Sequence, residues 1–186
     1  MRRLSGKRIA ILATDGFEQS ELFTPLEALR EEGALVEIVS PHDGAIQGME
    51  HMKEGKTVTV DTILEKAMPA NYDAIVLPGG AHNPDALRID EKATAFVRSF
   101  FEDKKPVAAI CHAPWVLINA GVTQGRKLTS WPTIRQDLRN AGAEVVDEEV
   151  VVDDLLGTSR GPKDLPAFCD RMIAIIAKPR FEAASS

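Results

Sequence analysis

The chain has 186 residues, of which 44% are apolar and 27% are charged, a composition typical of a single soluble globular domain. Its formal net charge is −6 and it has no Lys/Arg-rich block, so nucleic acid is not expected as a main partner, because a negative surface repels phosphate backbones. No apolar run approaches the ~20 residues that cross a membrane, and no apolar signal core follows the basic N-terminus, so we expect a cytoplasmic protein without membrane binding.

Short β-rich runs alternate with helical patterns in the first half of the chain. The pattern predicts strands at 8–13, 36–40, 57–61 and 73–77, and a helix at 20–32. Gly33 marks the end of this helix, and Pro78-Gly79-Gly80 closes the last of these strands.

The second half of the chain repeats this alternation. Ala93, Phe96, Val97 and Phe100 recur at i, i+3, i+4 and i+7, which predicts an amphipathic helix. Strands are predicted at 107–110, 144–152 and 155–158, and helices at 113–120, 133–140 and 165–176. The helix at 113–120 is apolar on nearly all sides, so we expect it to be buried.

The order of these elements predicts the fold class. Strands that alternate with helices favour a flavodoxin-like three-layer α/β sandwich, with a mainly parallel central sheet and helices on both faces. We expect a single domain at 7–177, with tails at 1–6 and 178–186 and a frayed end at 182–186.

Cys111 stands where a buried strand meets a helix. Small residues, Ala109 and Ala113, lie two places on either side, as the sharp turn of a nucleophile elbow requires. Such a turn would place the sulfur at the carboxyl edge of the sheet, where a helix N-terminus and His112 would favour the thiolate. The alternative is a buried structural cysteine. The other cysteine, Cys169, lies on the apolar stripe of the last helix and is predicted to fill the core as a free thiol.

Two further segments follow core strands and could face Cys111. Backbone N–H groups at Gly79 and Gly80 could form an oxyanion hole, although Pro-Gly-Gly is also an ordinary turn. Glu18 and Glu21 would share one face of the first helix. One of them could hydrogen-bond the sulfur, or both could simply complement the helix dipole.

The four histidines exclude two classes of site. His42, His51, His82 and His112 show no metal-ligand spacing, so a metal site is not expected. We expect no cofactor either. A glutaminase of the class I amidotransferase type draws its catalytic histidine from late in the chain. No histidine follows His112, which makes that activity a poor fit.

Five motifs occur in the order of a known family: 15–22, 77–80, 109–114, 128–131 and 158–166. With them the chain resembles the PfpI/ThiJ family of intracellular cysteine proteases and stress-response deglycases, within the class I glutamine amidotransferase-like superfamily. The resemblance runs from about residue 7 to residue 177. It is specific for the family and far less specific for the substrate.

The resemblance implies a set of catalytic residues. Cys111 would be the nucleophile, Glu21 would contact its sulfur, and the Gly80 and His112 N–H groups would form the oxyanion hole. His112 would be the paired imidazole, oriented by Asp85 of a neighbouring subunit, so the resemblance also implies a homodimer or a hexamer of dimers. The residues implied to line the pocket are Glu18, Gly79, Trp115 and Trp131. The two tryptophans would make the pocket bulkier and more apolar than in many relatives.

Two functions of different classes are compatible with these residues. The first is a hydrolase that acts through Cys111 on a small carbonyl compound, on peptide bonds or on glyoxal-type adducts of proteins. The second is a non-enzymatic oxidative-stress sensor or chaperone that responds to oxidation of Cys111.

Overall fold

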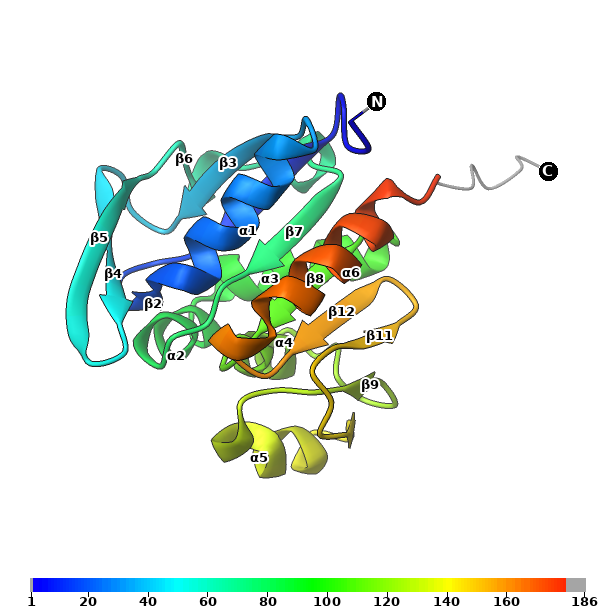
Figure 1. Ribbon diagram of the computed structural model, residues 1–186. Helices are drawn as coiled ribbons and strands as arrows, with labels where there is room; N and C mark the ends of the chain where they lie inside the picture. Colours follow the sequence, from blue (N-terminus) through cyan, green and yellow to red (C-terminus); the bar gives the residue numbers. More distant parts are fainter. Residues whose placement is uncertain (1, 180–186) are drawn as a thin grey trace.

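A seven-stranded sheet forms the centre of the computed structural model, which describes residues 2–179 (Figure 1). Its strands are β1 (Arg8–Leu12), β3 (Leu35–Ser40), β6 (Thr62–Ile63), β7 (Ala74–Leu77), β8 (Val107–Ile110), β11 (Val151–Asp153) and β12 (Leu156–Ser159). They are ordered β11-β12-β8-β7-β1-β3-β6, and only the β11–β12 pair is antiparallel. The predicted mainly parallel sheet is confirmed.

Helices cover both faces of this sheet (Figure 1). One layer holds α1 (Gln19–Glu31) and α6 (Leu165–Ala177), and the other holds α2 (His82–Arg88), α3 (Glu91–Glu102) and α4 (Pro114–Asn119). Alternate residues of β1 point to opposite faces, so Ile9 and Ile11 pack with the first layer while Ala10 and Leu12 pack with the second. Cys169 lies in the core of the first layer, as its position on the apolar stripe predicted.

A second, smaller sheet stands beside the start of α1 (Figure 1). It consists of β2 (Phe17–Glu18), β4 (Ala45–Glu50) and β5 (Lys53–Thr59) in the order β2-β4-β5. The prediction of one strand at 57–61 captured only the end of β5 and missed β4. The hairpin is difficult to predict from a hydrophobic pattern because it buries few apolar side chains. β5 has no fully buried residue, and Met52 at the tip is 94% exposed.

The predicted strand at 144–152 is wrong, because it is two strands in different sheets. β10 (Glu144–Val145) pairs with β9 (Lys127–Leu128), whereas β11 joins the edge of the main sheet. The acidic run 147–149 between them leaves the sheet for solvent, and Asp147 forms ion pairs with Arg135 and Arg160.

The helix after Cys111 is less buried than its composition predicted. It runs only from Pro114 to Asn119, with Trp115 and Ile118 half-buried and Asn119 exposed. The remaining elements are short: η1 (Leu64–Lys66), η2 (Pro69–Asn71), η3 (Pro132–Ile134), α5 (Arg135–Asn140) and η4 (Pro162–Asp164). Within residues 2–179, no helix combines the length and the apolar character needed to cross a bilayer.

The chain ends are described only in part. Within the expected N-terminal tail Leu4 is buried, and its N–H donates to the Glu32 carbonyl at 2.9 Å. Residue 1 and residues 180–186, which include the predicted frayed end, lie outside the described residues.

Candidate active site at the carboxyl edge of the sheet

Cys111 occupies a strained turn between β8 and α4. Its φ of 65° is in the left-handed region, which costs a residue with a side chain roughly 1–2 kcal/mol. Neighbouring loops hold the turn: the Cys111 N–H donates to the Ser159 carbonyl at 3.0 Å, and the Cys111 carbonyl accepts from the Trp131 N–H at 2.9 Å. Ala109 and Ala113 are fully buried beside it, so larger side chains would have no room.

Glu21, rather than Glu18, is the carboxyl beside the cysteine. Its side chain is fully buried, and Oε1 accepts from the Gly79 N–H at 3.1 Å. The carboxylate of Glu18 turns instead to the hairpin, where it accepts from the His51 N–H at 3.1 Å. The Gly79 N–H on Glu21 and the His51 N–H on Glu18 distinguish the two acids, which the predicted helical spacing left equivalent.

Glu21 is held in its neutral form. Burial, and then the charge of Glu18, raise the pKa of Glu21 to about 8. Oε2 is buried and has no hydrogen-bond partner among the described residues, which makes it the natural position for the proton. Because the carboxyl beside Cys111 is neutral, it does not repel a negative charge on the sulfur.

The pKa of the Cys111 thiol is raised overall, so the sequence expectation that the thiolate is favoured is not met, although opposing effects act on the thiol. Burial raises its pKa, and a negative charge on Glu21 raises it further. Hydrogen bonds from the backbone N–H groups of Gly80 and His112 lower it. Because Glu21 is protonated below about pH 8, its charge does not act on the thiol at neutral pH.

The Pro78-Gly79-Gly80 turn tolerates no side chain at either glycine. A Cβ at Gly79 would lie 2.6 Å from Glu21 Oε1 and 2.7 Å from the Cβ of Cys111. Gly80 has a φ of 84°, and a Cβ there would collide with the carbonyl oxygen of Gly16. The turn thus brings two backbone N–H groups against the thiol and the carboxyl.

The His112 ring lies between the sulfur and two indoles. Its Nδ1 is 3.2 Å from Cys111 Sγ. Trp131 stacks on the ring at a centroid distance of 5.8 Å, and Trp115 meets it edge-on at 5.3 Å. Burial lowers the pKa of His112, so the imidazole is neutral rather than cationic at neutral pH.

Both indoles are themselves held in place. Trp115 Nε1 donates to Asp137 at 2.9 Å, and the Arg88 guanidinium lies 5.0 Å from the centre of its ring. Trp131 packs against Gly161, where a Cβ would lie 3.0 Å from the indole. The imidazole therefore has little freedom to leave the sulfur.

Asp85 is the one predicted catalytic residue that a single chain does not bring to the others. It is exposed on α2, and within residues 2–179 it makes no hydrogen bond to His112. Its action across a subunit interface stays a prediction. In the same described part of the chain, no group of three metal-ligating side chains occurs.

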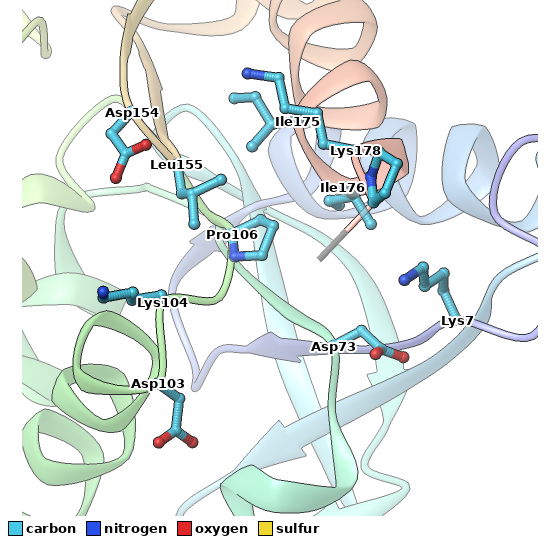
Figure 2. Close-up of a pocket in the computed structure, with 11 residues that line it drawn as sticks. Lys7, Asp73, Asp103, Lys104, Pro106, Asp154, Leu155, Ile175, Ile176 and Lys178 are labelled. Atoms are coloured by element: carbon cyan, nitrogen blue, oxygen red, sulfur yellow. The ribbon is translucent and has the colours of Figure 1, made fainter. Parts of the chain in front are cut away.

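A cavity of about 580 Å³ opens at the opposite end of the sheet (Figure 2). It lies near the amino ends of β7 and β8, where Pro106, Leu155 and Ile176 supply apolar walls, and Lys7 and Asp73 stand at its edge. Neither Cys111 nor Glu21 is among the residues that line it, so the cavity is separate from the Cys111 site.

Sequence reasoning missed Asn83 and Thr14. Asn83 is fully buried and links the loop after β7 to the loop after β1. Its position before Pro84 is typical of a turn residue, and nothing in the local pattern indicates burial.

The sequence profile of the DJ-1/PfpI family matches residues 7–175. The deglycase TK1284 of Thermococcus kodakarensis is 47% identical over 169 residues, which cover 91% of this chain and 99% of the relative. The protein/nucleic acid deglycase 2 of Escherichia coli is 47% identical over 163 residues, covering 87% and 93%. The crystal structure of Drosophila melanogaster DJ-1beta superposes with a TM-score of 0.84 at 29% identity and covers 92% of this chain and 90% of that one.

Proposed function

Because this chain belongs to the DJ-1/PfpI family, we propose that it is a cysteine-dependent hydrolase of the PfpI type that removes glyoxal-type adducts from proteins. The observation that carries the proposal is the position of Cys111. Its sulfur stands at a strained turn, with His112 Nδ1 at 3.2 Å and two backbone N–H groups directed at it. The names of the two curated relatives support deglycation as the activity.

The first chemical step is addition of sulfur to a carbonyl carbon. Neutral His112 takes the thiol proton, and the thiolate forms a C–S bond while the carbonyl π electrons move to oxygen. The Gly80 and His112 N–H groups stabilise that oxyanion. Neutral Glu21 adds no negative charge next to it, so the developing charge is not repelled.

The overall reaction balances without a cofactor. A glyoxal adduct of an amine and one water give the free amine and a hydroxy acid, with one carbon oxidised and its neighbour reduced. The balance holds when sulfur is bonded to the carbon that carried the amine, which is the aldehyde carbon of the glyoxal: the C–N bond breaks and the amine leaves with a proton, and the hydrogen of the sulfur-bound carbon moves as a proton to the neighbouring carbonyl carbon. Water then hydrolyses the resulting thioester to the hydroxy acid and the free thiol, so no external oxidant or reductant is consumed.

Peptide hydrolysis would use the same addition step on a larger substrate. The indoles of Trp115 and Trp131 pack against His112, so bulky side chains surround the imidazole beside Cys111. This crowding favours a small two- or three-carbon adduct over an extended peptide. Cooperation of Asp85 with His112 in a homodimer or hexamer belongs to the same proposal.

The test compares wild type with Cys111→Ala and with Cys169→Ala as the matched cysteine control. N-acetyllysine and N-acetylarginine are treated with methylglyoxal, free aldehyde is removed, and release of lactate is followed together with cleavage of a fluorogenic peptide. We expect lactate release from wild type and Cys169→Ala only. Equal release from Cys111→Ala would contradict the proposal. Oxygen uptake at Cys111 in peroxide without any turnover would favour the sensor alternative.

A further inference from the structure

Asn83 makes three hydrogen bonds from a fully buried side chain beside the candidate site. Nδ2 donates to the carbonyls of Pro78 and Gly79, each at 3.0 Å. Oδ1 accepts from the Thr14 N–H at 2.8 Å. One amide group thus contacts two consecutive peptide units of the β7–α2 turn and one of the β1–α1 loop.

These contacts fix the orientation of two peptide units, because each peptide unit is planar. In a trans peptide the C=O and the N–H point in opposite directions within one plane. The Pro78 carbonyl and the Gly79 N–H share one peptide unit, and the Gly79 carbonyl and the Gly80 N–H share the next. When Asn83 holds both carbonyls on its side, both N–H groups point to the other side.

That other side is the candidate active site. The Gly79 N–H donates to Glu21 Oε1 at 3.1 Å, and the Gly80 N–H is directed at the Cys111 sulfur. The Gly79 carbonyl also accepts from the Glu18 N–H at 3.3 Å, a longer contact than the one from Asn83. Residues 79 and 80 are both glycines, so neither has a side chain of its own that could fix this peptide unit.

We propose that Asn83 is a positioning residue, whose amide orients the Gly79 and Gly80 peptides so that one N–H holds Glu21 and the next forms the oxyanion hole. Its contact with Thr14 fixes the same turn to the loop that leads into α1, the helix that carries Glu21. Asn83 therefore fixes the position of the Glu21 carboxyl relative to the Gly80 N–H, and it does so without contacting the substrate. The inference rests on the proposed use of Cys111 as the nucleophile.

The test measures the thiol itself and therefore does not depend on a substrate. In a Cys169→Ala background, alkylation of Cys111 by iodoacetamide is followed from pH 6 to pH 10 for the full chain and for Asn83→Ala. Asp90→Ala is the control, because Asp90 also accepts from two backbone N–H groups, at the start of α3, but does not contact the site.

We expect Asn83→Ala to shift the alkylation midpoint to higher pH and to slow alkylation at pH 7 about tenfold, since a hydrogen bond to the charged sulfur is weakened. Asp90→Ala should match the parent while losing a similar amount of thermal stability. If Asn83→Ala does not fold, Asn83→Ser replaces it, because its hydroxyl can donate to only one carbonyl and should give an intermediate shift. A midpoint equal to that of the parent in a folded Asn83 variant would overturn the proposal.

Turnover supplies the second readout. With a methylglyoxal adduct as substrate, Asn83→Ala should lower kcat about 10- to 100-fold and leave KM unchanged, because the oxyanion is present only after addition. A rise in KM with unchanged kcat would contradict the positioning role. If the wild type releases no lactate, the proposed function fails, and the alkylation experiment still decides the role of Asn83.

Discussion

Replacement of Glu21 by Gln tests whether a buried neutral carboxyl stands beside Cys111. The variant keeps an oxygen that can accept from the Gly79 N–H, but it has no titratable proton. Glu21 has an ordinary pKa of 4.5 and a pKa of about 8 in the folded chain, raised mainly by burial. Between these two values the folded chain binds one more proton than the unfolded chain, so the free energy of unfolding falls as the pH rises.

The size of the effect follows from this difference. About 3.5 pH units at 1.36 kcal/mol per unit give a loss of about 5 kcal/mol in the free energy of unfolding between pH 4.5 and pH 8, and about 3 kcal/mol of it has occurred by pH 7. Above pH 8 both states are ionised and the contribution no longer changes. Glu21→Gln lacks this loss, so its stability relative to wild type should rise steadily across the interval.

Urea unfolding measured at half-unit steps from pH 4.5 to pH 9 gives the two stability curves. Other carboxyls and histidines titrate in both proteins, and their contributions cancel in the difference. Glu27→Gln, an exposed position on the same helix, is the matched control and should run parallel to wild type. A constant difference between wild type and Glu21→Gln over this range would refute the argument that Glu21 is held neutral.

Three further outcomes follow from the same geometry. Gly80→Ala should destabilise the chain by several kcal/mol and slow turnover, whereas Gly121→Ala, with a similar φ of 74° and open space around it, should cost only about 1 kcal/mol in urea unfolding. Cys111→Gly should unfold at higher urea than Cys111→Ala, because glycine relieves the strain at a φ of 65° while both variants lack the nucleophile. Trp131→Ala should raise the pKa of His112 in an NMR titration, because burial of the ring is what lowers it, and the acid limb of turnover should move to higher pH with it.

The strands and long helices of the sandwich were predictable because their patterns are local. The run at 107–110 is buried on both sides, and the stripe from Ala93 to Phe100 repeats at helical spacing, so each indicates its own structure. The family resemblance on the five motifs is likewise confirmed by the match over residues 7–175. The β4–β5 hairpin was missed because its stability comes from pairing with β2 and from contacts of α1 rather than from an apolar face of its own.

The choice between the two acids shows the limit of a local pattern at the site. The sequence predicts Glu18 and Glu21 on one face of a helix, whereas Glu18 ends β2 and only Glu21 lies within α1. Both side chains are buried, but Glu21 accepts from the Gly79 N–H in the loop after β7, whereas Glu18 accepts from the His51 N–H in the hairpin. Gly79 and His51 each lie more than 30 residues from the acid that they contact, so a local hydrophobic pattern cannot predict these contacts.

Cys111 illustrates how the site departs from the first expectation. The sequence predicted a thiolate favoured by the α4 dipole and a nearby imidazole. α4 has only six residues and the imidazole is neutral, so neither supplies the positive charge that was expected. The thiol pKa is lowered instead by two peptide N–H groups. The carboxyl of Glu21 does not raise it at neutral pH, because this carboxyl is protonated there. With Glu21 and His112 both neutral, neither side chain adds a charge that competes with a negative charge on the sulfur for these two N–H donors.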